Sequence, residues 1–186
     1  MEVENKDQRK EVAMMLAMHE ISEVVIAPGN QSAIDCKWKG RATQVKTAKA
    51  DASLRACHRK NGVRSQSYSD TDGIEQLVGC LIVESDGDYY LLHAVQPLDA
   101  LVEHGVFASD ENAGRMSISV PWGCYAEWIT GVPTKHFRKV SAWLQGPTYG
   151  WRTPVRLTPN SYLTAELLAE VAHVAANPAA MPTESV

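Results

Sequence analysis

The pattern of apolar and polar residues divides the first part of the chain into short elements. Residues 7–20 have the composition and apolar spacing of an amphipathic helix. Residues 23–28 (EVVIAP) predict a short buried strand, which ends where proline, glycine and asparagine follow. Residues 34–49 (IDCKWKGRATQVKTAK) predict a hairpin, and residues 50–60 predict either a short basic helix or an ordered loop.

A long apolar run lies near the middle of the chain. Residues 74–84 (IEQLVGCLIVE) predict a central strand, and SDGD at 85–88 predicts the turn that follows it. Residues 89–95 (YYLLHAV) predict the returning strand. A short helix is expected from Pro97 to about Val102, because proline in the first turn of a helix loses no intrahelical hydrogen bond.

The last part of the chain has a less regular pattern. Residues 105–158 show few clean periods, whereas residues 160–176 predict a helix that Asn160 or Ser161 would cap. The order of these elements predicts a mixed α/β domain built around a small mixed sheet flanked by helices.

Length and composition fit a single compact unit. The chain has 186 residues, of which 45% are hydrophobic, enough for one substantial core. We expect residues 1–104 to form that core and residues 105–186 to be a C-terminal extension, with both parts in one unit. The sequence has no run of 18 apolar residues and no signal-peptide pattern at its start, so we expect no membrane segment and a cytoplasmic protein.

Charge is unevenly distributed, although the net charge is only −4. Two basic segments, residues 37–64 and 133–156, suggest a surface that binds a polyanion; the alternative is an ordinary solvated surface. In the second segment basic residues alternate with tryptophans and tyrosines, which suits either DNA contact or a small aromatic cluster. The residues expected to contact DNA are Lys37, Lys39, Arg41, Lys49, Arg55, Arg59, Lys60, Arg64, Lys135, Arg138, Lys139 and Arg152.

Three residues of the expected hairpin form a candidate site. If Lys39 and Gly40 make a two-residue loop, Asp35 lies opposite Gln44, and directly opposed residues share a face of the sheet. Lys46 lies on the same face as Gln44, because side chains alternate along a strand. Asp35, Gln44 and Lys46 are therefore predicted to converge.

This combination of residue types suits the hydrolysis of a phosphodiester bond. A carboxylate such as Asp35, together with the amide oxygen of Gln44 and the carbonyl oxygen of Val45, can hold Mg²⁺, which prefers oxygen ligands. A lysine beside the ion, here Lys46, can orient the attacking water and stabilise the charge that develops on the phosphate. The basic residues around the hairpin would hold the phosphate backbone.

Asp35 followed by Gln44-Val45-Lys46 resembles the PD-(D/E)xK nuclease superfamily. The stretch QVKTA, which ends at Ala48, is similar to the branch with glutamine in the motif, which includes homing endonucleases of group I introns. The resemblance implies a restriction-endonuclease-like core and Mg²⁺, for which Mn²⁺ can substitute. It also implies that a glutamate of the first helix, Glu11 or less readily Glu20, joins the metal site.

The resemblance extends over residues 8–95 and implies an acid near the long strand, which would be Asp72 or Asp70. It implies an endodeoxyribonuclease that cuts double-stranded DNA at specific sites, as homing or restriction enzymes do. A Holliday junction resolvase is an alternative, and so is a DNA-binding module that keeps the fold without catalysis. Cutting both strands needs two active sites, so we expect a homodimer or homotetramer, associated with the nucleoid when bound to DNA.

Overall fold

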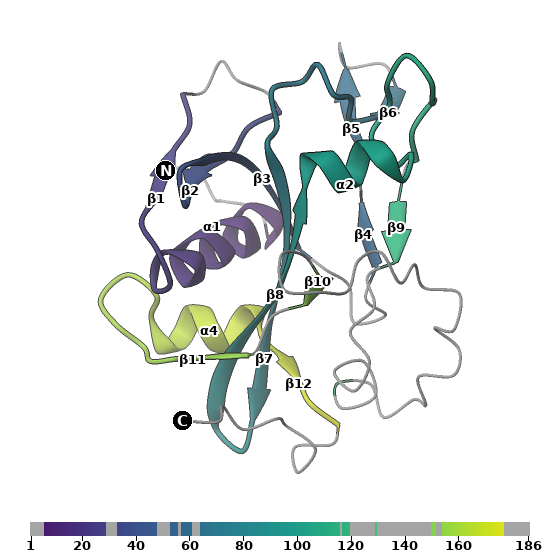
Figure 1. Ribbon diagram of the computed structural model, residues 1–186. Coiled ribbons are helices and arrows are strands. Elements are labelled where there is room, and N and C mark those ends of the chain that lie inside the picture. Colours follow the sequence, from purple (N-terminus) through teal and green to yellow (C-terminus); the bar gives the residue numbers. More distant parts are fainter. Residues whose placement is uncertain are drawn as a thin grey trace.

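The protein is a mixed α/β domain in which helices flank a mixed, curved sheet (Figure 1). The computed structural model describes residues 6–28, 33–47, 53–55, 57–60, 64–115, 117–119, 129, 150–151 and 154–176. The elements in chain order are α1 (Lys6–His19), β1 (Val24–Ile26), β2 (Cys36–Trp38), β3 (Arg41–Thr47), β4 (Ser53–Arg55), β5 (Cys57–Lys60), β6 (Arg64–Ser67), β7 (Gln76–Ser85), β8 (Asp88–Pro97), α2 (Leu98–Glu103), β9 (Ser117–Ser119), β10 (Gly150–Trp151), β11 (Val155–Leu157), α4 (Ala165–Val171) and β12 (His173–Val174).

The main sheet has eight strands and joins distant parts of the chain. Its principal order is β1-β2-β3-β7-β8-β10, with β11 paired to β8 and β12 paired to β7. β3 and β12 run parallel to β7, and the other pairs of this sheet are antiparallel. Two separate two-stranded sheets, β4-β9 and β5-β6, complete the described strands. The expected mixed α/β domain with a mixed sheet and flanking helices is thus confirmed.

The two faces of the main sheet carry different cores. We call the face that packs on α1 and α4 the α1 face; its core includes Met14, Trp38, Val45 and Val78. We call the opposite face the α2 face, because Leu101 of α2 packs there with side chains such as Leu77. Since side chains alternate along a strand, Gln44 and Lys46 lie on the α2 face of β3.

The β2–β3 hairpin has the register that the sequence predicts. Trp38 pairs with Arg41 and Cys36 with Thr43, which leaves Lys39 and Gly40 as the loop. Both loop residues have positive φ, 51° and 76°, as the tight turns preferred in hairpins require. The expected first helix, the central strand, its turn, the returning strand and the short helix after Pro97 are also present, as α1, β7, β8 and α2.

Two expectations for the first half are wrong. The predicted buried strand at residues 23–28 is present as β1 but is shorter, and it lies at the edge of the sheet, where Val25 is 53% exposed and Ile26 is 63% exposed. Residues 50–60 contain the strands β4 and β5 rather than a helix or loop. β4 pairs with the distant strand β9, which the local pattern does not show, whereas β5 pairs with the nearby β6 in a hairpin that the sequence interpretation missed.

The C-terminal helix also differs from its prediction. α4 is shorter than residues 160–176, and its N-cap is Thr164, whose hydroxyl accepts a hydrogen bond from the backbone N–H of Leu167. Asn160 instead closes the preceding turn, where its side-chain oxygen accepts hydrogen bonds from the backbone N–H groups of Tyr162 and Leu163. The chain leaves α4 to form β12, parallel to β7. No helix among the described residues is long and apolar enough to cross a membrane.

Candidate functional site

Asp35, Gln44 and Lys46 come together on the α2 face, at the start of the β2–β3 hairpin. Asp35 directly precedes β2, and its backbone N–H donates to the carbonyl of Thr43. This bond places Asp35 across from β3, so that its carboxylate reaches past Thr43 to the next two residues. The structure therefore brings the three predicted site residues into one cluster.

Hydrogen bonds fix the carboxylate of Asp35. Its Oδ2 accepts from the side-chain Nε2 of Gln44 at 2.7 Å and from the backbone N–H of Val45 at 2.8 Å. The same Nε2 is 3.3 Å from the carbonyl oxygen of Val45. The other carboxylate oxygen, Oδ1, receives no hydrogen bond from a described residue, and neither does the Oε1 atom of Gln44.

The surroundings of Asp35 disfavour its charged form. Burial raises the pKa of the Asp35 carboxyl above its ordinary value, and this effect outweighs the hydrogen bond from Val45 and the charge of Lys46, which both lower it. A carboxyl whose pKa is raised by burial beside a cation is typical of functional sites, although structural networks produce the same signature.

Lys46 extends over an aromatic ring. Its Nζ lies 5.2 Å from the centre of the Tyr68 ring, within the range of a cation–π interaction. Tyr68 is itself buried and packs against Phe107 in the core of the α2 face. The ring restricts the half-buried lysine to a position from which its charge acts on Asp35.

The Asp35 cluster contains three groups that carry oxygen atoms, namely the Asp35 carboxylate, the Gln44 amide and the Val45 carbonyl. Turning the Gln44 amide by half a turn would place Oε1 where Nε2 now lies, 2.7 Å from Asp35 Oδ2 and 3.3 Å from the Val45 carbonyl oxygen. These separations bracket the value of about 2.9 Å between neighbouring oxygens around an octahedral ion with ligands at about 2.1 Å. Asp35, Gln44 and Val45 can therefore supply three oxygen ligands.

The acids that the resemblance added have different positions. Glu11 is exposed on α1, the helix that packs against the α1 face, whereas Gln44 and Lys46 project from the opposite face. Asp72 closes a turn, in which its Oδ2 accepts from the backbone N–H of Ser69 at 2.8 Å. That turn lies beside the site, because a Cβ atom built on Gly73 would be 3.5 Å from the side chain of Ile34. No described group of three or more histidine, cysteine, aspartate or glutamate side chains could hold a metal.

Three of the expected DNA-contacting residues surround the hairpin. Lys37, Lys39 and Arg41 are exposed, and the Nζ of Lys39 lies 4.6 Å from the centre of the Trp38 ring. The other predicted contacts have side chains outside the described part of the structure: Lys49, Arg55, Arg59, Lys60, Arg64, Lys135, Arg138, Lys139 and Arg152. That residues 37–64 and 133–156 form a surface that binds a polyanion therefore stays a prediction.

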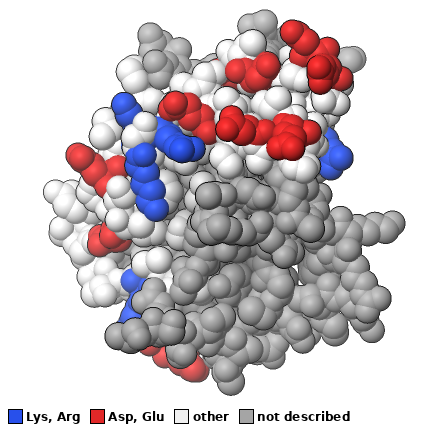
Figure 2. Space-filling view, in the orientation of Figure 1, with Lys and Arg blue, Asp and Glu red and all other residues white. Residues whose placement is uncertain are grey.

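Figure 2 shows where charge gathers on one side of the molecule. Several lysine and arginine side chains lie toward the side of α1 and the β2–β3 hairpin, together with some acidic ones, and acidic side chains form a band over α2 and the loop after it. Exposed acids of that region include Asp99, Glu103, Asp110 and Glu111. A polyanion that reached the Asp35 cluster would therefore be attracted from the hairpin side and repelled from the α2 side.

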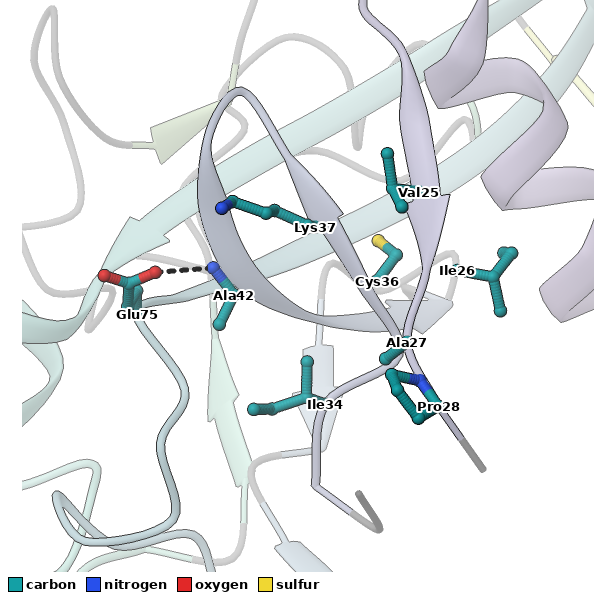
Figure 3. A pocket seen from close by; sticks show the side chains of 9 residues that line it. All are labelled: Val25, Ile26, Ala27, Pro28, Ile34, Cys36, Lys37, Ala42 and Glu75. Carbon is teal, nitrogen blue, oxygen red and sulfur yellow. Dashed lines mark hydrogen bonds between the residues drawn. The ribbon is translucent and has the colours of Figure 1, made fainter. Parts of the chain in front are cut away.

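The sequence interpretation missed one further acid of this region. Glu75 directly precedes β7, and its Oε2 accepts from the backbone N–H of Ala42 at 2.6 Å (Figure 3). In return, the backbone N–H of Glu75 donates to the Ala42 carbonyl. A glutamate at the start of a long apolar strand was the only available signal, and it does not show which strand becomes the neighbour.

Comparisons with known proteins give little further information. No protein-family model matches the chain, and no curated protein does. A solved structure described as "Crystal Structure of MepB" is similar with a TM-score of 0.38 and 20% sequence identity. The similarity covers 63% of this chain and 81% of that chain. A similarity of this size carries no argument about function.

Proposed function

We propose that the protein is a metal-dependent endodeoxyribonuclease with a restriction-endonuclease-like core. One observation supports this proposal above all others. The Nε2 atom of Gln44 lies 2.7 Å from Asp35 Oδ2 and 3.3 Å from the Val45 carbonyl oxygen, so turning this amide would give two oxygen–oxygen separations that suit ligands of one Mg²⁺ ion, and the charge of Lys46 acts on the Asp35 carboxyl.

Each residue of the cluster has a distinct part in this reaction. Asp35, the Val45 carbonyl and, after its amide turns, Gln44 would hold Mg²⁺ or Mn²⁺. Glu11, the further ligand that the resemblance implies, lies on α1 against the opposite face of the sheet and has no part in this proposal. The bound ion supplies Lewis-acid stabilisation of the negative charge on the phosphate. Lys46 orients the attacking water and, as a cation, stabilises the charge that the phosphate gains as the bond to the leaving oxygen breaks.

Double-stranded DNA is the proposed substrate, on the strength of the resemblance and of the exposed cations Lys37, Lys39 and Arg41 beside the cluster. Site-specific cutting of the homing or restriction type is our first proposal, and resolution of Holliday junctions is the second. Cutting both strands requires two active sites, so a homodimer or homotetramer is part of the proposal.

A DNA-binding module without catalysis is the alternative that two observations favour. Gln44 uses its N–H to hold Asp35 rather than presenting an oxygen, and the described residues contain no cluster of three or more acidic, histidine or cysteine side chains. In that case the same hydrogen bonds would only stabilise the hairpin, and the protein would bind DNA without nicking it.

The deciding experiment is cleavage of a supercoiled plasmid, genomic DNA and a four-way junction with Mg²⁺, with Mn²⁺ and with EDTA. We expect metal-dependent cutting that Asp35→Ala abolishes and Lys46→Ala reduces by about 10²-fold or more, because general acid–base and electrostatic groups contribute on this scale. DNA binding should persist in Lys46→Ala. Lys6→Ala, which removes an exposed lysine at the start of α1, is the matched control.

The outcome also separates the alternatives. Preferred cutting of the junction would select the resolvase, and cutting of genomic DNA at few positions would select the site-specific enzyme. DNA binding without metal-dependent nicking of any of the three substrates would select the non-catalytic module. Full cleavage activity in Lys46→Ala would contradict the roles assigned here.

A further inference from the structure

A small pocket opens beside the candidate site. It has a volume of about 290 Å³ and is formed by β1, by the β2–β3 hairpin and by the residue that precedes β7. Figure 3 shows Lys37, Ala42 and Glu75 at one end of it, and Ala27, Pro28 and Ile34 at the other. Its volume is at the lower end of the range of about 300–1,000 Å³ that is usual for small-molecule sites.

Part of the pocket lining lies on the same face of the sheet as the Asp35 cluster, whereas Ile26 and Cys36, which also line the pocket, alternate to the other face. Val25 pairs with Lys37, and Lys37 pairs with Ala42, so these three side chains form one row across three strands. Asp35 and Gln44 are each two residues further along their strands, a distance of about 6.8 Å. A ligand in the pocket would therefore be a neighbour of the group that Asp35 and Lys46 act on.

The lining combines apolar walls with two charged groups. Val25, Ala27, Ile34 and Ala42 supply the apolar surface. Lys37 makes no ion pair or hydrogen bond with a described residue, and Figure 3 shows its side chain extending along the hairpin toward Ala42. The Oε2 atom of Glu75 is held by the Ala42 N–H, while its Oε1 has no hydrogen-bond partner among the described residues.

We propose that this pocket binds a single unpaired nucleotide next to the scissile phosphate. The apolar walls would take the base and sugar, Lys37 would bind the adjoining phosphate, and Glu75 Oε1 would accept a hydrogen bond from an N–H group of the base. The inference rests on the proposed nuclease function and deepens it, because it assigns the protein a substrate in which one nucleotide has left the stack.

The size and chemistry of the pocket suit an unpaired nucleotide. A volume of about 290 Å³ is enough for one base and its sugar. A carboxylate can only accept a hydrogen bond, and an unpaired cytosine offers both N–H bonds of its amino group, whereas pairing in a duplex uses one of them. Bases are taken out of the stack most easily where they are mismatched, bulged or at a junction, which is where such a pocket would select its substrate.

Equilibrium binding in EDTA tests the inference without cleavage. The probes are a fully paired duplex and the same duplex with one extra unpaired deoxycytidine, or with a 2-pyrimidinone deoxynucleoside that lacks the amino group. We expect the cytosine probe to bind about tenfold more tightly than the paired duplex and several-fold more tightly than the 2-pyrimidinone probe, as one charge-assisted hydrogen bond allows.

Two variants test the carboxylate and the apolar wall of the pocket separately. In Glu75→Gln the side-chain oxygen would accept from the Ala42 N–H and the NH₂ group would face the pocket, so the preference for cytosine over 2-pyrimidinone should disappear or reverse. Glu103→Gln, which removes the same charge on α2, is the matched control and should leave it unchanged. Ala42→Leu fills the pocket and should reduce binding of both unpaired probes to the level of the paired duplex.

Lys37 has its own control in the neighbouring Lys39. Lys37→Ala should weaken the unpaired probes more than the paired duplex, whereas Lys39→Ala should weaken all three equally. Thermal melts of each variant would show that it is folded. Equal binding of paired and unpaired probes by the wild type, or no binding of any probe, would overturn the inference.

The two proposals fail separately. Metal-dependent cleavage without a preference for unpaired nucleotides would leave the nuclease and remove the pocket's role. A preference for the unpaired cytosine without any cleavage would leave the pocket's role in a binding module and remove the nuclease.

Discussion

Buried side-chain amides on the two faces of the central sheet differ in their hydrogen bonds. On the α1 face the indole N–H of Trp38 donates to the carbonyls of Met18 and Ser22, and the side-chain amide of Gln76 donates to the Trp38 carbonyl and to Thr43. On the α2 face Asp35 keeps a carboxylate oxygen without a described partner. Neither amide atom of the fully buried Gln96 has a partner among the described residues.

The difference between these buried amides affects the stability of the two faces. Buried polar groups with hydrogen-bond partners strengthen a core, whereas buried groups without partners cost free energy and persist where they have another use. The register places Gln44, Leu77 and Gln96 in one row across β3, β7 and β8, so Gln96 lies on the same face as the candidate site. Gln76 and Gln96 give the direct comparison, because the amide of Gln76 on the α1 face has described partners whereas that of Gln96 on the α2 face has none.

Trp38 tests the α1 face, with the largest expected effect. Trp38→Ala should lower the free energy of unfolding by about 3–5 kcal/mol, since the side chain is fully buried between α1 and the sheet. Trp38→Phe keeps an aromatic ring and loses the N–H bonds, so it should cost less, about 1–2 kcal/mol. Urea denaturation measures both. Similar small losses in the two variants would show that this face is not the main support.

Gln44 tests the site itself. Gln44→Glu would place a second carboxylate 2.7 Å from Asp35 Oδ2, and two such charges repel unless a proton or a cation lies between them. Without metal at pH 8 we expect a loss of about 2 kcal/mol or more in unfolding free energy, which Mg²⁺ should restore. Gln44→Met, which adds no charge, is the control. A Gln44→Glu variant that is insensitive to Mg²⁺ would contradict the metal site.

Gln96 tests whether the α2 face gives up stability. Gln96→Leu removes two buried polar atoms at similar volume, so it should raise the free energy of unfolding by about 1–2 kcal/mol. The same substitution at Gln76, whose amide donates to Trp38 and Thr43, should be destabilising. Denaturation curves of the two variants give the comparison, and destabilisation by both would show that Gln96 has a hydrogen-bond partner in solution.

Asp35 gives the smallest expected effect, and it depends on pH. Its pKa is higher in the folded protein than in the unfolded chain, so the folded state binds more protons between these two values. The contribution of Asp35 to stability is therefore favourable in acid, is lost as pH rises through this window, and is a cost at neutral pH. Asp35→Asn should raise Tm by about 2 °C at pH 7 and by less at pH 4. An equal shift at both pH values would contradict this account.

Local chemistry was enough to predict much of the fold. The 3.6-residue period predicted α1, and the apolar run with its SDGD turn predicted β7 and β8. The hairpin register followed from Gly40 and the alternation of side chains, which is why the amino-acid sequence alone predicts that Asp35, Gln44 and Lys46 are neighbours. These features depend on residues within a few positions of one another.

Pairing between distant segments decided the rest. Nothing near residues 23–28 shows that β1 has a free edge, and nothing near Glu75 shows that it meets Ala42. The raised pKa of Asp35 likewise comes from burial, which the packing of the whole domain determines. The sequence by itself determined which groups are available for chemistry on the hairpin. The tertiary structure decided which of them are desolvated, which have partners and where a pocket adjoins them, because these properties depend on contacts across the whole fold.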